Sequence, residues 1–339
     1  MNVTSDSKKS DGQIRNFYAR KHVFLTGCTG FDGSLILEKL LRTCTDIGNV
    51  YIMTREKKAV AEGVVEDFAK QSSLPCIIYR PSIIIIAIRE PYRGWIDTKY
   101  GPVVLLALQA FGLLHVVPAE PGVISDYIPV DLATNGLLSA IWDYTVNRET
   151  NEPQEYNCGS SDWNPMRFHT DCPKYTKSIE KYPSSKIVWY PFMFLVGNIY
   201  VFLVLHVLFH VLPAIIADVV LMIQSKKPKA LKVVSKATVQ VRALYYFIST
   251  SWIITADKLK SVMNRMDVTD LEEFSFDMTL IDWVEVSEVL ALNARKIVKG
   301  PIEAIPDASR RFQKLEVLDY TIVTLLWTLA FFFLFRIIS

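Results

Sequence analysis

The stretch that decides the fold is residues 22–42, HVFLTGCTGFDGSLILEKLLR. It begins with a short apolar run, residues 22–25, whose β-branched and aromatic side chains predict a strand. Residues 34–42 place leucine and isoleucine at the spacing of an amphipathic helix. Residues 49–54, NVYIMT, predict a second strand. The order strand, glycine turn, helix, strand is typical of a nucleotide-binding α/β fold.

The turn between the first strand and the helix reads T-G-x-x-G-x-x-G and starts at Thr26. Gly27 and Gly30 allow a tight turn and close approach of the backbone to a pyrophosphate. Gly33 lets the helix pack on the strand, and the free N–H groups of the helix N-terminus face the phosphate. Asp32 suits the helix dipole but not a nearby phosphate. We therefore expect its side chain to point away from the cofactor. If it pointed toward the phosphate, it would weaken cofactor binding.

The residues after the second strand favour one cofactor over another. An acid at this point favours NAD, whereas this chain has Arg55, with Lys57 and Lys58 close by. Because cations suit a 2′-phosphate, the pattern favours NADP(H). The alternative is that these are ordinary surface charges.

The overall composition excludes several other classes of protein. The chain has 339 residues, 50% of them hydrophobic, and its mean hydropathy of +0.22 fits a soluble body with a few membrane segments. A net charge of +2 gives no basic field for nucleic acid. Five cysteines without a C-x-x-C fit neither a zinc site nor a disulfide scaffold, so we expect free thiols. No G-x-S-x-G, H-E-x-x-H or Walker sequence is present.

The chain beyond the second strand alternates predicted helices and strands. Residues 59–70 predict a helix, and residues 74–87, LPCIIYRPSIIIIA, predict a buried strand. Pro81 has no N–H to donate, so it should interrupt the pairing of that strand. Residues 103–114 and 131–144 predict two further helices.

Three later segments bear on membranes. Residues 187–223 carry a single formal charge, Asp218, and as one helix would reach about 55 Å, against a hydrocarbon core of about 30 Å. With lysines on both flanks, a re-entrant hairpin or an interfacial segment with cytosolic ends is favoured over a tilted span or a soluble core. Residues 224–256 are basic and aromatic, so they form a solvated helix face or contact anionic lipid headgroups. Residues 320–335 have no charge and predict a C-terminal membrane anchor.

Several segments together resemble one family, the alcohol-forming fatty acyl-CoA reductases, especially the insect type. The segments are FLTGCTGFDGSLILEKLLRTCTDIGNVYIMTREKK (24–58), YRPSI (79–83), EPYRGWID-x-x-x-GP (90–102), DYIPVDLATNGLLSAIWDY (126–144), NCGSSDWNP (157–165), HVLPAIIADVV (210–220) and FSFDMTLIDW (274–283). They occur in the order of the family and extend from about residue 21 to about residue 339.

The resemblance implies an extended short-chain-dehydrogenase fold that reduces a long-chain acyl-CoA with two NADPH to a fatty alcohol, through an aldehyde. It also implies a peroxisomal or endoplasmic-reticulum membrane protein that faces the cytosol and is a possible homo- or hetero-oligomer. The cofactor-binding residues that follow from the glycine turn, the cations and the resemblance are Thr26, Gly27, Thr29, Gly30, Phe31, Gly33, Arg55, Pro81, Ser82 and Ile83.

Catalysis in the family uses a Y-x-x-x-K pair, in which the tyrosine donates a proton and the lysine holds the ribose. By resemblance Lys58, which precedes Ala59-Val60-Ala61-Glu62, occupies the lysine position. The tyrosine position is then Thr54, whose hydroxyl is a far weaker acid than a phenol. Yet residues 55–58, REKK, also match the end of the family's second strand.

The simplest account of this double match is that a long internal block is absent near residues 55–59. Parallel strands need crossovers of a dozen or more residues, and four residues cannot supply the missing strands and the tyrosine. An incomplete gene model or splice form, a degenerate paralogue and a remodelled protein are the open causes. We expect the chain as written to be inactive. The alternative function is a catalytically dead membrane scaffold that pairs with an intact paralogue.

The predicted fold is a shortened NAD(P)-binding Rossmann-like α/β domain followed by a mainly helical domain with membrane segments. The predicted boundaries are a polar tail (1–20), the reductase domain (21–150), the C-terminal domain (151–315) and the anchor (316–339).

Other candidate residues receive structural interpretations. Tyr79, Tyr92 and Tyr100 lack a lysine four residues later, so none is expected to replace the missing acid. His206 and His210 lie one helical turn apart, but no third ligand is near in sequence, so no metal site is expected. Asp126 and Asp131 are expected to serve in helix capping and loop hydrogen bonding.

Overall fold

The computed structural model describes residues 12–26, 31–53, 77–96, 101–147, 154–297 and 305–338. The predicted helix at 59–70 lies outside these residues. The chain divides into two compact units, each assembled from segments distant in sequence. The first unit comprises Met1–Thr98, Asp126–Pro165 and Ile253–Ile281, and the second comprises Lys99–Ser125, Met166–Trp252 and Asp282–Ser339.

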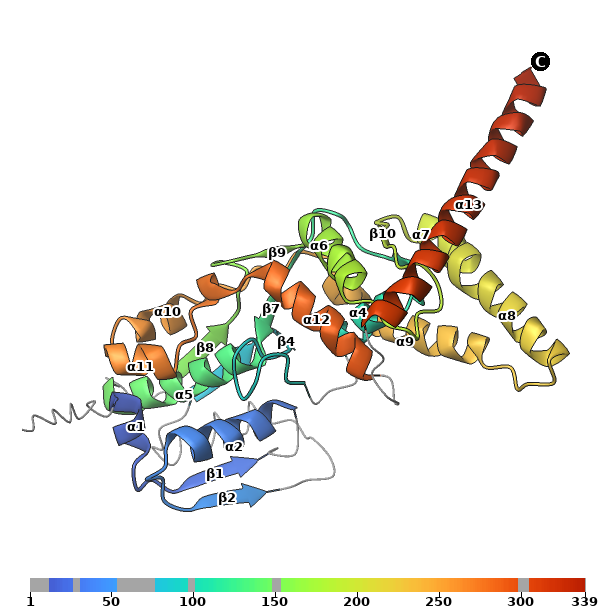
Figure 1. Ribbon diagram of the computed structural model, residues 1–339. Helices are drawn as coiled ribbons and strands as arrows, with labels where there is room; N and C mark the ends of the chain where they lie inside the picture. The colour runs from blue at the N-terminus through green and yellow to red at the C-terminus, as the bar shows by residue number, and fades with distance from the viewer. Residues whose placement is uncertain are drawn as a thin grey trace, which may run out of the picture. The chain divides into compact units, whose positions relative to one another are not determined.

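The first unit opens with the predicted strand, helix and strand. These are β1 (Val23–Thr26), α2 (Phe31–Thr43) and β2 (Val50–Met53), which Figure 1 shows together. β1 and β2 pair in parallel, with Thr26 opposite Met53 at the carboxyl ends. α2 packs on β1 and buries Leu35 and Leu40. The prediction for this part of the chain is confirmed.

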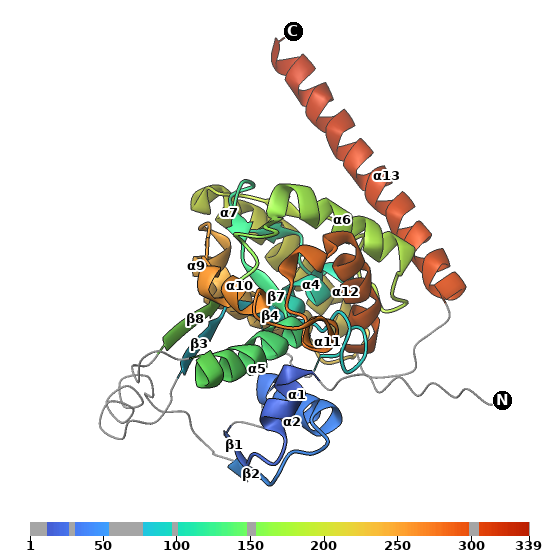
Figure 2. The same cartoon turned by 90° about the vertical axis from the view of Figure 1, so that its left-hand side faces the viewer.

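The predicted strand at 74–87 is split at Ser82. β3 (Ile77–Pro81) pairs in parallel with β8 (Gln154–Cys158), and β4 (Ile83–Ile85) pairs in parallel with β7 (Tyr127–Pro129), as Figure 2 shows. The Ser82 N–H donates to the Cys158 carbonyl. The chain therefore changes neighbours directly after Pro81, where the sequence predicted an interruption.

Helices complete the first unit. α5 (Val130–Asn147) covers the predicted range 131–144 and packs on β3, β4, β7 and β8. The remaining helical elements are α1 (Gln13–Tyr18), α10 (Asp257–Met263), α11 (Val268–Glu273) and the 3-10 helix Met278–Leu280. Within the described residues, β1–β2, β3–β8 and β4–β7 are separate two-stranded pairs.

The second unit is mainly helical. Its core helices are α4 (Pro102–Ala110), α6 (Phe168–Lys181) and α12 (Trp283–Ile297), with α12 lying against the other two. Its strands are β5 (Val116–Val117) parallel to β10 (Phe194–Leu195), and β6 (Ile124–Ser125) antiparallel to β9 (Met166–Arg167).

The helix predicted over 103–114 ends earlier, at Ala110. Gly112 has a φ of 63°, in the left-handed region that terminates helices, and its N–H donates to the Gln109 carbonyl. A Cβ at Gly112 would lie 1.9 Å from the Trp189 carbonyl oxygen, so close approach of the backbone also requires glycine there.

The apolar segment forms a helix that does not turn back within itself. α7 (Ile199–His206), a π-helical turn (Val207–Val211) and α8 (Leu212–Ile223) follow without a break. Pro213 lies in the first turn of α8, where the wider π turn accommodates its missing N–H. The chain does not reverse inside 199–223, so the re-entrant alternative is wrong for this stretch, and the chain reverses after Ile223, before α9 (Ala230–Ile248). The interfacial alternative stays a prediction.

Two helices relate to the membrane predictions. Among the described residues, one helix, Ile199–Ile223, is long and apolar enough to cross a membrane by length and composition. The predicted anchor at 320–335 lies within α13 (Ile305–Ile338), a single helix of 34 residues (Figure 1).

Candidate dinucleotide site

The first unit brings the carboxyl ends of two parallel strands to the N-terminus of a helix. Thr26 ends β1 opposite Met53, which ends β2, and α2 begins at Phe31. Gly33 lies in the first turn of α2. In nucleotide-binding folds this edge holds the pyrophosphate at the helix N-terminus and the ribose at the second strand. The predicted residues Gly27, Thr29, Gly30 and Arg55 lie outside the described residues.

Phe31, the first residue of α2, packs beside the segment that follows Pro81. Its ring stacks on Trp95, with centroids 5.2 Å apart and planes at 17°. Both rings and Ile84 lie against a core formed by Leu35, Ala87 and Val130. The Ala87 N–H donates to the Trp95 carbonyl, which folds the 88–95 loop back onto the end of β4. The unit thus brings the predicted site residue Phe31 close to the predicted stretch that ends at Ile83.

Two polar atoms near this edge are buried without a partner. The Ser82 hydroxyl oxygen has no hydrogen bond, although its backbone N–H is paired. One carboxyl oxygen of Asp32 is also unpaired, and burial raises the pKa of Asp32. A raised pKa makes the charged form of Asp32 less favourable, in the direction that lessens repulsion of a phosphate. A buried Ser82 hydroxyl without a hydrogen-bond partner fits a bound dinucleotide near the N-terminus of α2.

Two of the tyrosines considered in the sequence analysis, Tyr79 and Tyr92, lie in the described residues. Lys58 and Thr54 lie outside them, as does Tyr100. The Tyr79 hydroxyl donates to the Ala133 carbonyl at 2.7 Å, and burial raises its pKa well above 10. Tyr92 is 58% exposed and lies in the loop after β4. Tyr79 is therefore held by a backbone carbonyl, and Tyr92 lies at the surface.

Asp126 has a structural role. The backbone N–H groups of Ser160 and Ser161 donate to its carboxylate at 2.8 and 3.1 Å, as does the Ser161 hydroxyl. Gly159 is needed because a Cβ there would lie 2.5 Å from an Asp126 oxygen. The NCGSSDW stretch is therefore shaped around Asp126, which confirms its predicted loop hydrogen bonding.

Asp131 holds the loop beside the candidate site. The N–H groups of Ile88, Arg89 and Glu90 donate to its carboxylate at 2.7–3.2 Å. Burial raises the pKa of Asp131, and these hydrogen bonds oppose that rise. The predicted loop hydrogen bonding is confirmed.

Lys39 is a buried residue that the sequence analysis missed. Its ammonium donates to Glu90 Oε2 and to the Glu273 carbonyl, both at 2.6 Å. Burial lowers the pKa of Lys39, and the ion pair with Glu90 opposes this shift. The available signal was its spacing of four from Leu35, which places it on the buried face of α2.

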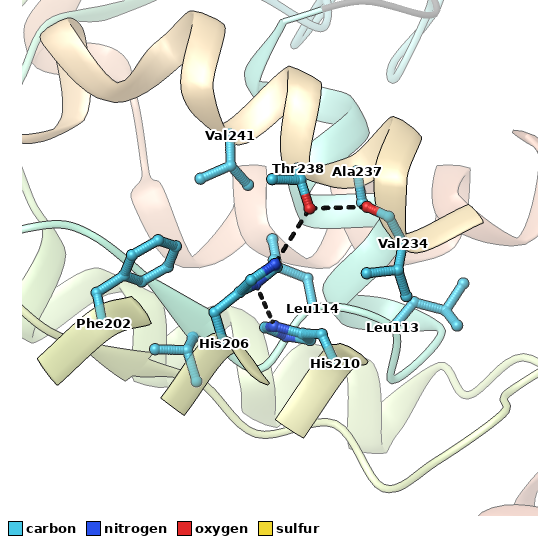
Figure 3. A pocket seen from close by; sticks show the side chains of 10 residues that line it. Leu113, Leu114, Phe202, His206, His210, Val234, Ala237, Thr238 and Val241 are labelled. Carbon is cyan, nitrogen blue, oxygen red and sulfur yellow. Dashed lines mark hydrogen bonds between the residues drawn. The ribbon is translucent and has the colours of Figure 1, made fainter. Parts of the chain in front are cut away.

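The second unit contains a small apolar cavity (Figure 3). The lining residues include Leu113, Phe202, His206, His210 and Val241. Within the described part of the chain, no group of three or more His, Cys, Asp or Glu side chains is placed to hold a metal ion.

Comparisons with known proteins point to one family. Two family models, both described as male sterility protein, match residues 209–298 and, for the NAD-binding part, residues 25–59 and 57–137. The fatty acyl-CoA reductase wat of Drosophila melanogaster is 32% identical over 296 residues, which cover 86% of this chain and 55% of the relative. Fatty acyl-CoA reductase 1 of Rattus norvegicus is 29% identical over 299 residues, covering 87% of this chain and 56% of the relative.

The chain therefore spans about half the length of the curated relatives it matches. Two solved structures also align. A putative epimerase from Burkholderia cenocepacia (10% identity, 80% of this chain, 99% of the other) and a dTDP-glucose 4,6-dehydratase from Bacillus anthracis (11%, 79%, 97%) each have a TM-score of 0.38, too low to support a functional argument.

The NAD-binding match is interrupted. Its first part ends at residue 59 and its second part begins at residue 57, so both claim residues 57–59. This overlap includes Lys57 and Lys58, the residues that the sequence analysis assigned to both sides of a join.

Proposed function

The chain belongs to the fatty acyl-CoA reductase family, and from this premise we propose that it binds NADPH and long-chain acyl-CoA but forms no alcohol as written. The observation that carries the proposal is the double match of residues 57–59. By resemblance, the end of the second strand and the catalytic lysine position both fall on this overlap. The family's reaction is the NADPH-dependent reduction of an acyl-CoA to a fatty alcohol.

The cofactor half of the site supports NADPH binding. β1, α2 and β2 have the geometry of a dinucleotide half-site, and Arg55 follows Met53 by two residues. Arg55 would pair with the 2′-phosphate, with Lys57 close by in sequence. Ser82 has a buried hydroxyl free to donate or accept at the ligand. The bound cofactor would supply the hydride.

The chain lacks the tyrosine that would donate a proton in the family's Y-x-x-x-K pair. As hydride reaches the substrate carbonyl, its oxygen needs a proton from a group of suitable pKa. Thr54 stands at the tyrosine position, and an aliphatic hydroxyl is a far weaker acid than a phenol. Tyr79 is committed to the Ala133 carbonyl. Lys58 can hold a ribose, but it has no tyrosine whose pKa it could lower.

A membrane role completes the proposal. We place the chain on the cytosolic face of a peroxisomal or endoplasmic-reticulum membrane, anchored through residues 316–339, as the family resemblance suggests. A chain that keeps the cofactor half-site and the second unit but lacks the catalytic tyrosine could pair with an intact paralogue. Co-purification with an active reductase, without turnover of its own, is the outcome this second function predicts.

The cofactor part of the proposal is tested by binding. Titration of the purified chain with NADPH and with NADH should show tighter binding of NADPH. Arg55→Ser should weaken NADPH binding by about tenfold and leave NADH binding unchanged, because a charge-assisted pair with the 2′-phosphate is lost. Arg20→Ser, at an exposed arginine before the amino end of β1, is the matched control. Equal losses for both cofactors would contradict the assignment of Arg55.

A further inference from the structure

The helix 199–223 carries its histidines and its single acid on the inside and mainly apolar side chains on the outside. The inner positions, spaced four apart and buried or half-buried, are Phe202, His206, His210, Ala214 and Asp218. Outer positions, each 43–60% exposed, are Val201, Val204, Leu208, Leu212, Ile215 and Val219. A helix on the surface of a water-soluble protein has the opposite arrangement.

His210 and His206 belong to a chain of hydrogen bonds in which each group accepts from one neighbour and donates to the next (Figure 3). The His115 backbone N–H donates to His210 Nε2 at 2.9 Å, so this nitrogen carries no proton. Neutral His210 therefore donates from Nδ1 to His206 Nδ1, also at 2.9 Å. His206 then donates from Nε2 to the Thr238 hydroxyl at 3.3 Å, and that hydroxyl donates to the Val234 carbonyl. Both histidines are thus satisfied in the neutral state without water.

Asp218, the remaining inner polar residue, is satisfied in a different way. Its carboxylate accepts the backbone N–H groups of Lys229, Ala230 and Leu231 at 2.7–3.0 Å. These are free donors at the N-terminus of α9, so a side chain of one helix caps the next. The cap joins 199–223 and α9 into a helical hairpin, and α8 and the π turn pack on α9.

We propose that this hairpin docks on a lipid bilayer with anionic headgroups, with its outer apolar face in one leaflet. Exposing that face to water is unfavourable, whereas lipid covers it without requiring any polar partner. Internally paired polar groups facing the protein and apolar groups facing outward are the arrangement that a hydrocarbon surrounding requires.

The charges of the hairpin specify the kind of lipid. Lys226, Lys227 and Lys229 are exposed in the turn, and no acidic residue occurs between Asp218 and Asp257. Lysines beside an apolar membrane-facing surface favour anionic headgroups. The surface and its cations therefore match one partner, an anionic bilayer.

The side chains of α9, the second helix of the hairpin, determine how the hairpin lies relative to the bilayer. If 199–223 crossed the bilayer, α9 would have to return through it. α9 carries exposed Lys232, Lys236 and Arg242, which are costly in hydrocarbon. An aromatic cluster at its end, with Tyr246 and Trp252 rings 5.0 Å apart, suits the membrane–water boundary. The hairpin therefore lies in the plane of the interface, with both ends on one side.

The proposal is tested with the full chain and vesicles of phosphatidylcholine and phosphatidylserine that contain a phospholipid with a photoactivatable acyl chain. Mass spectrometry of the labelled peptides should locate label in 199–223, but not around Val146 or Leu280, which are exposed apolar residues of the first unit. Ile215→Glu combined with Val219→Glu should reduce labelling of 199–223 by about tenfold, because buried apolar area drives interfacial binding. Val146→Glu, the matched control, should leave it unchanged.

Two further measurements make the proposal falsifiable independently of the C-terminal anchor. Trypsin added outside sealed vesicles should cleave at Lys226 or Lys229, because the turn stays on the outer side. Complete protection of the turn would mean that the hairpin crosses the bilayer and would overturn the proposal. Absence of lipid label from 199–223, with self-crosslinking through that helix, would assign the surface to a second copy of the chain instead. Label in α13 alone would likewise overturn it.

Discussion

His115 is a residue whose charge state the second unit depends on. It is 5% exposed, its ring packs on Phe192 with centroids 4.3 Å apart, and its Nε2 lies 3.3 Å from the Tyr190 carbonyl oxygen. Burial lowers the pKa of His115 to about 4 from 6.5, against the smaller opposing effect of the Tyr190 carbonyl. The His210 ring lies 5.8 Å away, so a proton on His115 would also face that neighbour.

This shift predicts the direction of a pH effect. Between pH 6.5 and 4 the unfolded chain binds a proton at His115 and the folded chain does not. Stability is therefore lost as pH falls through this window, by at most roughly 3 kcal/mol. Urea unfolding at pH 7 and pH 4.5 should show a smaller acid loss in His115→Gln than in the unchanged chain. His169→Gln, at an exposed histidine, is the control, and an identical acid loss in all three chains would contradict the account.

The role of a single residue can be predicted from its type, but its hydrogen-bond partners cannot when they lie far away in the sequence. The roles of Asp126 and Asp131 in loop hydrogen bonding were predictable from residue type. Their partners, Ser160 in one case and Ile88 in the other, lie 34 and 43 residues away. Lys39 was missed because its carbonyl partner, Glu273, is 234 residues distant. Local spacing predicts that such a residue is buried, but only tertiary folding supplies what it contacts.

At the scale of elements, the junction between α8 and α9 depends on one carboxylate. Asp218→Ala removes the acceptor for three N–H groups, so the first turn of α9 should fray. Hydrogen exchange of the amides of residues 229–231 should accelerate by about tenfold. Asp218→Asn keeps one acceptor oxygen and should give an intermediate effect. Asp257→Ala, which changes an exposed acid, is the control and should not alter hydrogen exchange at residues 229–231. Unchanged exchange at these residues in Asp218→Ala would show that the cap is dispensable.

The same junction shows where element prediction succeeds and fails. β1, α2 and β2 were predicted because periodicity and the glycine turn agree locally. The reversal in the apolar segment was misplaced because Pro213 suggests a break, whereas the π turn Val207–Val211 carries the helix past it. The end of α4 at Ala110 was missed because the helical spacing continues through the positive-φ position Gly112.

At the scale of the whole molecule, the two family matches differ in their continuity. The family match on 209–298 is continuous, whereas the NAD-binding match is split at 57–59. Among the described residues, the strands of the first unit form separate pairs. The sequence could predict this break because two motifs claim the same lysines, but its cause lies in the gene and its transcripts. Sequencing transcripts across the codons for residues 55–59 would distinguish those causes.

The central claim is that the chain retains the cofactor half of a fatty acyl-CoA reductase and lacks its proton donor. The most direct test incubates the purified 339-residue chain with NADPH and hexadecanoyl-CoA in lipid vesicles and measures fatty alcohol, fatty aldehyde and NADPH oxidation together. We predict that NADPH binds, while neither alcohol nor acyl-CoA-dependent oxidation of NADPH is detected. Formation of fatty alcohol in proportion to the NADPH consumed would contradict the account, because it would require a proton donor other than the missing tyrosine.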